Sequence, residues 1–324
     1  MDKTKQTSTY EQKQNRTILW GLIIIVLIVL IGSFVVGWFV SDQATHIVPR
    51  ESTMMKTNQE KDPWRLKMIA EGRLEDTTIP SQGHDLPVTW YYTEASQGSR
   101  DHNTIILVHG LGSNRHNLQD KAEYFLSLGF NALTYDQRET NENPLDENTY
   151  GVLERLDLEA AVQAVRKEAP NRIIGLWGES FGGETVGLGL AMESIDQEVD
   201  FAILDCPLSE AKHMILSAIE KMGIPWPKYW YRFASLVTRM RLGFSFDDAT
   251  VKDFIGSSKT PILVIHSEAD EITPGFMGKD IYDAVTHERK SILTFKDAKH
   301  CEGFHSHTQE YKQAVETFLD KILN

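Results

Sequence analysis

The feature that most constrains the fold is a short apolar run that leads directly into a serine flanked by glycines. Residues 173–177 have the composition of a buried strand, and Gly178, Ser180 and Gly182 follow in a G-x-S-x-G pattern. The next segment, residues 183–192, is compatible with a helix. Because the turn is so sharp, only small residues fit two positions before and after the serine. The pattern predicts a serine hydroxyl held clear of a sheet at a helix N-terminus, where negative charge is favoured.

A second apolar stretch, residues 17–40, contains no charged residue. As a helix it would be about 36 Å long, enough to cross the hydrocarbon core of a bilayer. Trp20 and Trp38 lie near its two ends, where amphipathic rings favour the membrane interface. The run is longer than the apolar region of a typical signal peptide. We therefore predict a retained transmembrane anchor, with a cleaved signal peptide and a buried core helix as the alternatives.

The basic residues around this stretch predict its orientation. Lys3, Lys5, Lys13 and Arg16 precede it, whereas the first lysine or arginine after it is Arg50. By the positive-inside rule, residues 1–16 form a cytoplasmic tail and the remainder of the chain lies outside the cytoplasm. Residues 41–61 are polar and predict a linker to a globular domain at 62–324.

Composition excludes one class of partner and leaves other questions open. The formal net charge is −13, and no basic or aromatic platform is visible, so we expect no nucleic-acid partner. Cys206 and Cys301 are the two cysteines of the chain, too few for a disulfide framework. The sequence does not decide whether Cys206 and Cys301 form a disulfide. It also does not decide the oligomeric state.

From residue 77 onward, apolar runs alternate with helix-compatible segments. This alternation predicts an α/β fold, with a mainly parallel sheet covered by helices on both faces. Besides the strand before Ser180, the predicted strands are residues 86–92, 104–109, 131–135, 201–204, 261–266 and 291–295. The predicted helices are residues 62–71, 117–128, 153–167, 277–285 and 311–323.

One long segment interrupts the alternation between strands 201–204 and 261–266. It is unusually apolar and includes the aromatic run at residues 225–231. A plain crossover between parallel strands needs far fewer residues. We interpret residues from about 207 to 255 as a helical cap insertion, with extra helices on the sheet edge as the alternative.

A serine hydroxyl needs an adjacent base to become a nucleophile, and that base needs an orienting acid. Both are expected after Ser180, on loops that follow later strands. The loop after strand 261–266 offers Asp270 as the acid, with Glu268 and Glu271 as close neighbours. Asp205, which follows strand 201–204, is a further alternative.

The loop after strand 291–295 offers the base. His300 follows that strand directly, whereas His305 and His307 begin the last predicted helix. Together with Cys301 and Glu302, these histidines also raise the alternative of a zinc site. However, a structural zinc site needs paired spacings and a second group of ligands, which the sequence does not supply.

Four motifs in this order give the chain a resemblance to the α/β-hydrolase superfamily over residues 62–324. They are His109-Gly110, the run from Gly178 to Gly182, the run from Ser267 to Pro274, and Ala298-Lys299-His300. Four matches in the family's order are far more specific than any one of them.

A further run, Asp136-Gln137-Arg138 with Tyr150-Gly151 after it, is similar to a bacterial serine-hydrolase group that often carries an N-terminal membrane anchor. Relatives in that group are described as cell-surface hydrolases, esterases or peptidase-like proteins. The chain departs from the group's Arg-Gly-His-Gly run, which here reads Arg138-Glu139-Thr140-Asn141. That run shapes a loop, so the departure puts the substrate in doubt and leaves the chemistry intact.

The resemblance and the spacing imply the same roles. Ser180 would be the nucleophile, His300 the base that passes its proton to the leaving group, and Asp270 the acid that orients His300. The backbone N–H groups of Leu111 and Phe181 would form the oxyanion hole. No metal and no organic cofactor is implied.

We therefore expect a membrane-anchored serine hydrolase with its catalytic domain outside the cytoplasm. Carboxylic ester hydrolysis is the default expectation, with a hydrophobic acyl or aryl group in the small-molecule substrate. The alternatives are a serine peptidase or amidase of the same fold and a non-catalytic surface binding protein. His109 is expected to shape the oxyanion loop, and the sequence does not decide whether Glu179 braces the serine turn or faces a pocket.

Overall fold

The structure is a computed structural model that describes residues 3–323, with side chains from residue 13 onward. The first two residues of the predicted cytoplasmic tail lie outside the described range. The chain forms two compact units. One comprises residues up to 44 together with 215–245, and the other comprises residues 45–214 and 246 onward.

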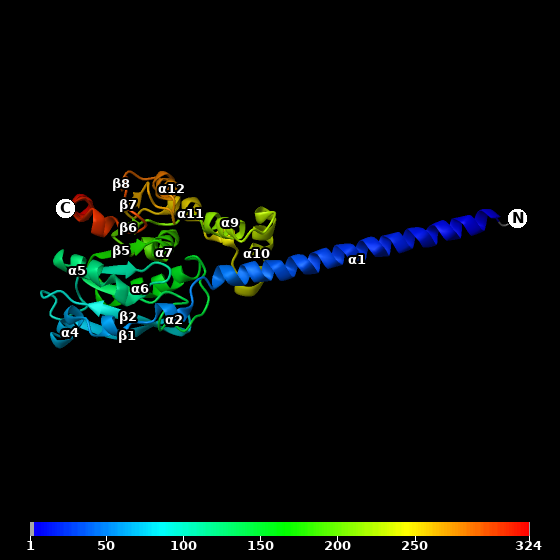
Figure 1. Ribbon diagram of the computed structural model, residues 1–324. Helices are drawn as coiled ribbons and strands as arrows, with labels where there is room; N and C mark the ends of the chain where they lie inside the picture. Colours follow the sequence, from blue (N-terminus) through cyan, green and yellow to red (C-terminus); the bar gives the residue numbers. More distant parts are fainter. Residues whose placement is uncertain (1–2, 324) are drawn as a thin grey trace. The chain divides into compact units, whose positions relative to one another are not determined.

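The larger unit is built on an eight-stranded sheet in the order β1-β2-β4-β3-β5-β6-β7-β8 (Figure 1). Its strands are β1 (Leu74–Ser81), β2 (His84–Tyr91), β3 (Thr104–Val108), β4 (Asn131–Tyr135), β5 (Ile174–Glu179), β6 (Phe201–Asp205), β7 (Ile262–Ser267) and β8 (Lys290–Phe295). Strand β2 runs antiparallel to β1 and β4, and all other pairs are parallel. The predicted mainly parallel α/β sheet is confirmed.

Helices cover both faces of this sheet. On one face, Phe125 and Val315 share a buried core with Leu107 and Trp177 of the central strands. On the other face, Gly278 packs against the ring of His266 at the end of β7. The first face carries α4 (Pro63–Ala70), α5 (Gln119–Ser127) and α14 (Thr308–Leu323), and the second carries α6 (Glu154–Glu168), α7 (Phe181–Gly189) and α12 (Phe276–Ala284). Shorter helices are α2 (Arg50–Thr53), α3 (Thr57–Glu60), α8 (Glu193–Asp196), α11 (Val251–Phe254) and α13 (Gly303–Ser306).

Strand β1 is a finding that the sequence pattern did not predict. It pairs only with β2 at the edge of the sheet, and more of its residues face solvent than in the central strands. With Pro80 and few apolar residues, it lacks the continuous apolar signal of a buried strand. Gln82 and Gly83 adopt positive φ in the turn between β1 and β2.

The smaller unit contains the N-terminal helix α1 (Lys3–Thr45), most of α9 (Ala211–Lys221) and α10 (Pro227–Leu242). Of the residues that the structure describes, α1 is the one helix long and apolar enough to cross a membrane. The large apolar side chains from Ile18 to Ile31 are 37–64 % exposed, so α1 is not the helix of a buried core. The predicted polar linker at 41–61 begins inside α1 and continues through the short helices α2 and α3.

Candidate active site

Ser180 lies at the sharp turn between β5 and α7, in the centre of the sheet. Its backbone has φ +54° and ψ −118°, a conformation that residues with a side chain rarely adopt. The N–H of Ser180 donates a hydrogen bond to the carbonyl of Asp205 at 2.8 Å, which fixes the turn to the adjacent strand β6. The strained serine of the predicted strand–turn–helix arrangement is therefore present.

The flanking glycines are required by close approaches of the backbone. A Cβ at Gly178 would lie 2.3 Å from the carbonyl oxygen of Gly182. A Cβ at Gly182 would lie 2.1 Å from the carbonyl oxygen of Val108, at the end of β3. Ordinary contacts between such atoms are about 3.5 Å or longer. Each glycine therefore lets α7 start directly against the carboxyl ends of β3 and β5.

The three residues predicted to act together lie in a chain of hydrogen bonds. Nε2 of His300 is 2.9 Å from Oγ of Ser180, and Nδ1 of His300 is 2.7 Å from Oδ2 of Asp270. Asp270 follows β7, and His300 lies in the turn between β8 and α13. Because β5, β7 and β8 are parallel, their carboxyl ends meet at one edge of the sheet, which brings the three side chains together.

The carboxylate of Asp270 is buried and fully bonded. Oδ1 accepts hydrogen bonds from the backbone N–H groups of Ile272 and Thr273, at 2.9 and 2.8 Å. Oδ2 accepts from the Thr273 hydroxyl as well as from His300. Burial alone would raise the pKa of Asp270, but the bonds from His300 and the two N–H groups outweigh it and lower that pKa to about 2. Asp270 is therefore ionised at neutral pH and holds the Nδ1–H tautomer of His300.

The loop after β3 lies against the serine turn. A Cβ at Gly110 would lie only 3.2 Å from Cβ of Ser180. His109 is buried; Nδ1 of its ring donates to the Gly110 carbonyl at 2.8 Å, and Nε2 accepts from the N–H of Gln137 at 3.0 Å. Burial lowers the pKa of His109, so the ring is neutral, as these two bonds require. His109 thus shapes the loop that carries Leu111.

Phe181 is the first residue of α7, so its N–H belongs to the first helical turn and has no intrahelical partner. Leu111 lies two residues after His109 on the facing loop. The structure places these two residues on the two segments that meet beside Ser180.

The rival acids have other environments. Glu268 and Glu271 are exposed to solvent. Asp205 is buried, and its Oδ2 accepts a hydrogen bond from the Tyr311 hydroxyl at 2.8 Å. Burial raises the pKa of Asp205 despite that bond. Of the four acids, Asp270 is the one that the structure brings to His300.

The rival histidines are engaged elsewhere. His305 lies on α13 and pairs with Asp120 at 3.0 Å, and His307 pairs with Asp297 at 2.9 Å. His266 is buried at the end of β7, where its Nε2 is 2.7 Å from the carbonyl oxygen of Thr273. His266 thus bonds the backbone of the loop that carries Asp270.

Gln137 received no role in the sequence analysis, although it connects the two halves of the site. Its side-chain amide donates to the His109 carbonyl and accepts from the Thr185 hydroxyl of α7. The sequence indicated a role for Gln137 only through its place in the run Asp136-Gln137-Arg138, because a glutamine by itself predicts no particular contact. Gln137 therefore links the oxyanion loop to the helix that begins at Phe181.

The segment where the chain departs from the family's Arg-Gly-His-Gly run is tied to the body by buried contacts. Nε of Arg138 donates to Asp157 at 2.8 Å, and the side-chain amide of Asn141 donates to Asp136 at 2.9 Å. The Thr140 hydroxyl donates to the Gln137 carbonyl. These bonds fit the expectation that the run shapes a loop.

Two carboxyl groups near the serine in sequence, Glu179 and Glu184, have raised pKa values. Burial raises the pKa of Glu179 to about 7, although the charge of Lys121 opposes that shift. Glu179 also accepts a hydrogen bond from the backbone of Gly110, so it braces the turn against the oxyanion loop. Neither side-chain oxygen of Glu184 has a partner among the described residues, and burial raises its pKa well above the usual range.

Two thiols lie beside the histidine. A ring nitrogen of His300, Sγ of Cys206 and Sγ of Cys301 all lie within 4.8 Å of one another, and both cysteines are free. Sγ of Cys301 is 3.5 Å from Nε2 of His300. Such a set suits a soft metal ion, but an ion there would occupy the nitrogen that faces Ser180. This set shares His300 and Cys301 with the cluster that the sequence suggested, whereas His305 and His307 of that cluster pair with aspartates.

Comparison with known proteins agrees with the architecture. The model of the alpha/beta hydrolase fold family matches residues 103–251. The structure aligns with the esterase Pf2001 of Pyrococcus furiosus at a TM-score of 0.62 and 21 % identity, covering 81 % of this chain and 96 % of the esterase. The chain therefore has the α/β-hydrolase fold.

Two curated proteins are similar to this chain in sequence over about two thirds of its length. The chain is 27 % identical to the Bacillus subtilis protein YqkD over 68 % of its length and 72 % of YqkD. It is 25 % identical to the lysophosphatidylserine lipase ABHD12 of Macaca fascicularis over 69 % of its length. That match spans 56 % of the lipase, little more than half of its length.

Proposed function

We propose that this chain is a membrane-anchored serine hydrolase that cleaves carboxylic esters through an acyl-enzyme on Ser180. The observation that carries the proposal is the unbroken pair of hydrogen bonds from Ser180 to His300 and from His300 to Asp270, at 2.9 and 2.7 Å. A nucleophile, a base within reach and an ionised orienting acid are the parts that acyl transfer requires.

In the proposed mechanism, Oγ of Ser180 attacks the acyl carbonyl while its proton passes to Nε2 of His300. Asp270 stabilises the imidazolium that forms, and His300 then gives the proton to the leaving alkoxide. Water repeats the sequence on the acyl-enzyme, with His300 again as the base, and releases the acid. Every step uses side chains of this chain and requires no cofactor.

The negative charge that develops on the carbonyl oxygen needs donors at the same edge of the sheet. The proposed donors are the N–H groups of Phe181 and Leu111, next to the N-terminus of α7, whose dipole also favours an anion. Each such donor typically lowers the barrier by about 3 kcal/mol. The bonds of His109 and Gln137 to this loop support a preorganised hole.

A hydrophobic acyl or aryl group is the proposed substrate feature. The similarity to an esterase and to a lipase of lysophosphatidylserine supports an ester with an apolar part. An ester is also the easier substrate, because alkoxide leaves more readily than amine. We also propose the domain boundaries that the sequence predicts, including a helical cap at about residues 207–255.

The membrane anchor is proposed at residues 17–40, with the N-terminus in the cytoplasm and the catalytic domain outside it. The length, apolarity and exposure of α1 support this assignment. To test it, protease is added to intact cells that express the full chain. Digestion of the catalytic domain is expected, and complete protection would mean that the domain faces the cytoplasm.

The test of the chemistry is hydrolysis of p-nitrophenyl esters, from acetate to laurate, by the full chain in detergent. Ser180→Ala and His300→Ala are each expected to lose several orders of magnitude in kcat/KM. His305→Ala is the matched control, because it removes an exposed histidine that pairs with Asp120 and should leave kcat/KM unchanged. Turnover by Ser180→Ala equal to that of wild type would refute the mechanism.

Labelling by a fluorophosphonate separates the alternatives if no ester is cleaved. Labelling of wild type and not of Ser180→Ala would indicate a serine hydrolase that prefers amides or an untested ester. Equal absence of label from both would favour the non-catalytic binding protein.

A further inference from the structure

The last turns of α1 pack closely against α10 within the smaller unit. Ser33, Gly37 and Ser41 recur every four residues on one stripe of α1, and all three are buried. A Cβ at Gly37 would lie 3.3 Å from the backbone of Phe233, so the two helix backbones come into near contact. Small residues at this spacing are how helices approach one another inside a membrane.

Polar contacts fix the direction of this packing. The hydroxyls of Ser33 and Tyr229 are 2.7 Å apart, and those of Ser41 and Thr238 are 2.8 Å apart. Near the end of α10, Arg241 donates to Asp42 at 3.1 Å. Because these contacts advance in the same order along both helices, α10 runs parallel to α1 along the predicted span. Ser33 is seven residues from the end of the apolar run, which places Tyr229 about 10 Å below that end.

The surface of α10 and of the loop before it that does not contact α1 has apolar side chains exposed, as expected for a surface in a membrane. Met222, Trp226, Leu236 and Met240 are 53–74 % exposed. Exposed basic residues alternate with these side chains along the segment, namely Lys221, Lys228, Arg232 and Arg239. Residues 215–245 contain five lysines and arginines against one glutamate, a net charge of +4 in a chain of −13. Exposed apolar side chains with flanking cations are typical of segments that lie in anionic lipid.

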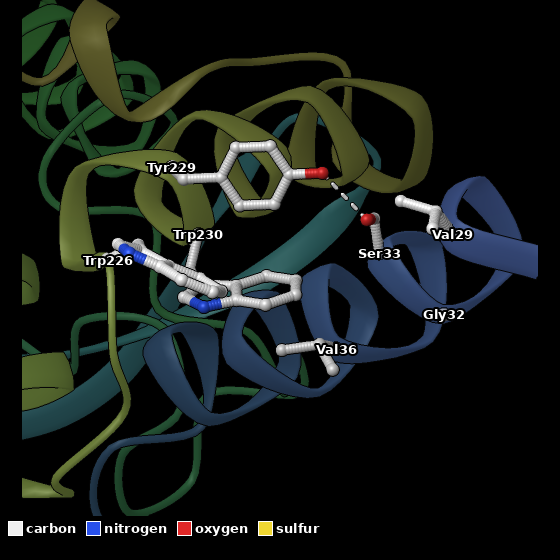
Figure 2. Close-up of a pocket in the computed structure, with 7 residues that line it drawn as sticks. All are labelled: Val29, Gly32, Ser33, Val36, Trp226, Tyr229 and Trp230. Carbon is white, nitrogen blue, oxygen red and sulfur yellow. Dashed lines mark hydrogen bonds between the residues drawn. The ribbon is translucent and has the colours of Figure 1, made fainter. Parts of the chain in front are cut away.

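An apolar hollow of about 700 Å³ opens between the two helices (Figure 2). Val29, Gly32, Ser33 and Val36 line it from α1, and Trp226, Tyr229 and Trp230 line it from the start of α10 and the residue before it. Its two hydroxyls bond to each other, so they offer little to a polar ligand. A hollow of this volume is large enough for a small-molecule ligand.

We propose that this hollow binds an acyl chain of an anionic phospholipid, with residues 215–245 lying in the bilayer beside the anchor. The proposal rests on the proposed membrane span, because the hollow is lined by residues from the second half of that span. The apolar lining matches the acyl chain, and the exposed Arg239, which follows Thr238 at the level of Ser41 and the end of the span, matches the anionic headgroup. The inference is a lipid-binding site on the anchor, separate from the chemistry at Ser180.

The chain supplies a matched pair of variants. Gly32 lines the hollow, and a Cβ there would meet no atom within 4 Å, so Gly32→Phe fills the hollow without a backbone clash. Gly21 also has open space around it and lies on the same helix away from the hollow. Gly21→Phe therefore makes the same change in helix propensity and bulk and leaves the hollow empty.

The experiment uses the full chain in phosphatidylcholine vesicles that contain phosphatidylglycerol with a diazirine on one acyl chain. After photolysis, trypsin releases residues 222–228 and 229–232 as separate peptides, which mass spectrometry reads for lipid adducts. We expect label on both peptides in wild type and in Gly21→Phe, and loss of that label in Gly32→Phe. Replacing the probe with diazirine phosphatidylcholine should lower the label, because the cations no longer meet an anionic headgroup.

The outcomes separate this proposal from the membrane anchoring itself. Label on residues 17–40 without label on 222–232 would overturn the lipid site and leave the anchor standing. Absence of label from both segments would refute the anchor as well. Equal labelling of wild type and Gly32→Phe would show that lipid contacts the aromatic residues without entering the hollow, against the proposal. Equal labelling by the two headgroups would overturn the choice of an anionic lipid. Ester hydrolysis by Ser180 is measured independently of all these results.

Discussion

The sharpest prediction concerns Gly182, because the structure gives its consequence a magnitude. In Gly182→Ala, the new Cβ would lie 2.1 Å from the carbonyl oxygen of Val108 and 2.7 Å from that of His109. Both neighbours are backbone atoms, so a contact of about 3.5 Å requires a shift of more than about 1 Å between α7 and the oxyanion loop. A misplacement of about 1 Å in a catalytic constellation can lower the rate about 100-fold, or about 2.7 kcal/mol of barrier.

We therefore expect Gly182→Ala to lower kcat/KM on a p-nitrophenyl ester by about 100-fold or more, with a slower reaction toward fluorophosphonate. Overpacking should also lower the free energy of unfolding by about 1–3 kcal/mol. Thermal unfolding of the same preparation checks that the variant is folded at the assay temperature.

Gly189→Ala is the matched control on the same helix. Its Cβ would meet the tip of the Leu158 side chain at 2.9 Å, which can move without disturbing the backbone. Both variants gain the same helix propensity, about 1 kcal/mol. Activity close to wild type is expected for Gly189→Ala. A folded Gly182→Ala enzyme with wild-type kcat/KM would refute the claim that the glycine is needed to place the oxyanion loop.

Three further predictions follow from the buried ionisable groups. Asp270→Asn should lower kcat by orders of magnitude through the wrong tautomer of His300. In wild type, the pKa of about 2 at Asp270 contributes stability that is complete above pH 4 and lost toward pH 2, and urea titrations of both proteins check this loss. Burial raises the pKa of Glu184, so the unfolding free energy should fall with pH above about 4.5, by up to about 1.4 kcal/mol per pH unit. Glu184→Gln should remove that fall, and an unchanged slope would contradict the assignment. Cys206 and Cys301 should both titrate as free thiols after unfolding without reductant, whereas one disulfide per chain would contradict the structure.

Much of the site followed from local sequence, because its chemistry depends on residues with few conformational options. A serine between two glycines after an apolar run specifies the turn, since the close backbone contacts at Gly178 and Gly182 exclude larger residues. The candidates Asp270 and His300 followed from the rule that loops after parallel strands meet at one edge.

Other parts depended on contacts between segments far apart in the chain. The sequence offered several acids and histidines, and the choice among them came from distance: His300 reaches Ser180 and Asp270, whereas His305 reaches Asp120. Gln137 joins the loop after β3 to α7 through bonds that no local pattern predicts. Strand β1 was missed because an edge strand needs no continuous apolar run.

By itself, the sequence determined the class of fold, the serine turn and the presence of an apolar N-terminal helix, because backbone sterics and apolar periodicity act over a few neighbouring residues. Only the tertiary structure decided that Ser33, Gly37 and Ser41 form the face of α1 that receives α10. Spacing of small residues marks one side of a helix, but it does not name the partner. The partner is set by which distant segment offers a complementary surface, and that emerges only when the whole chain is packed.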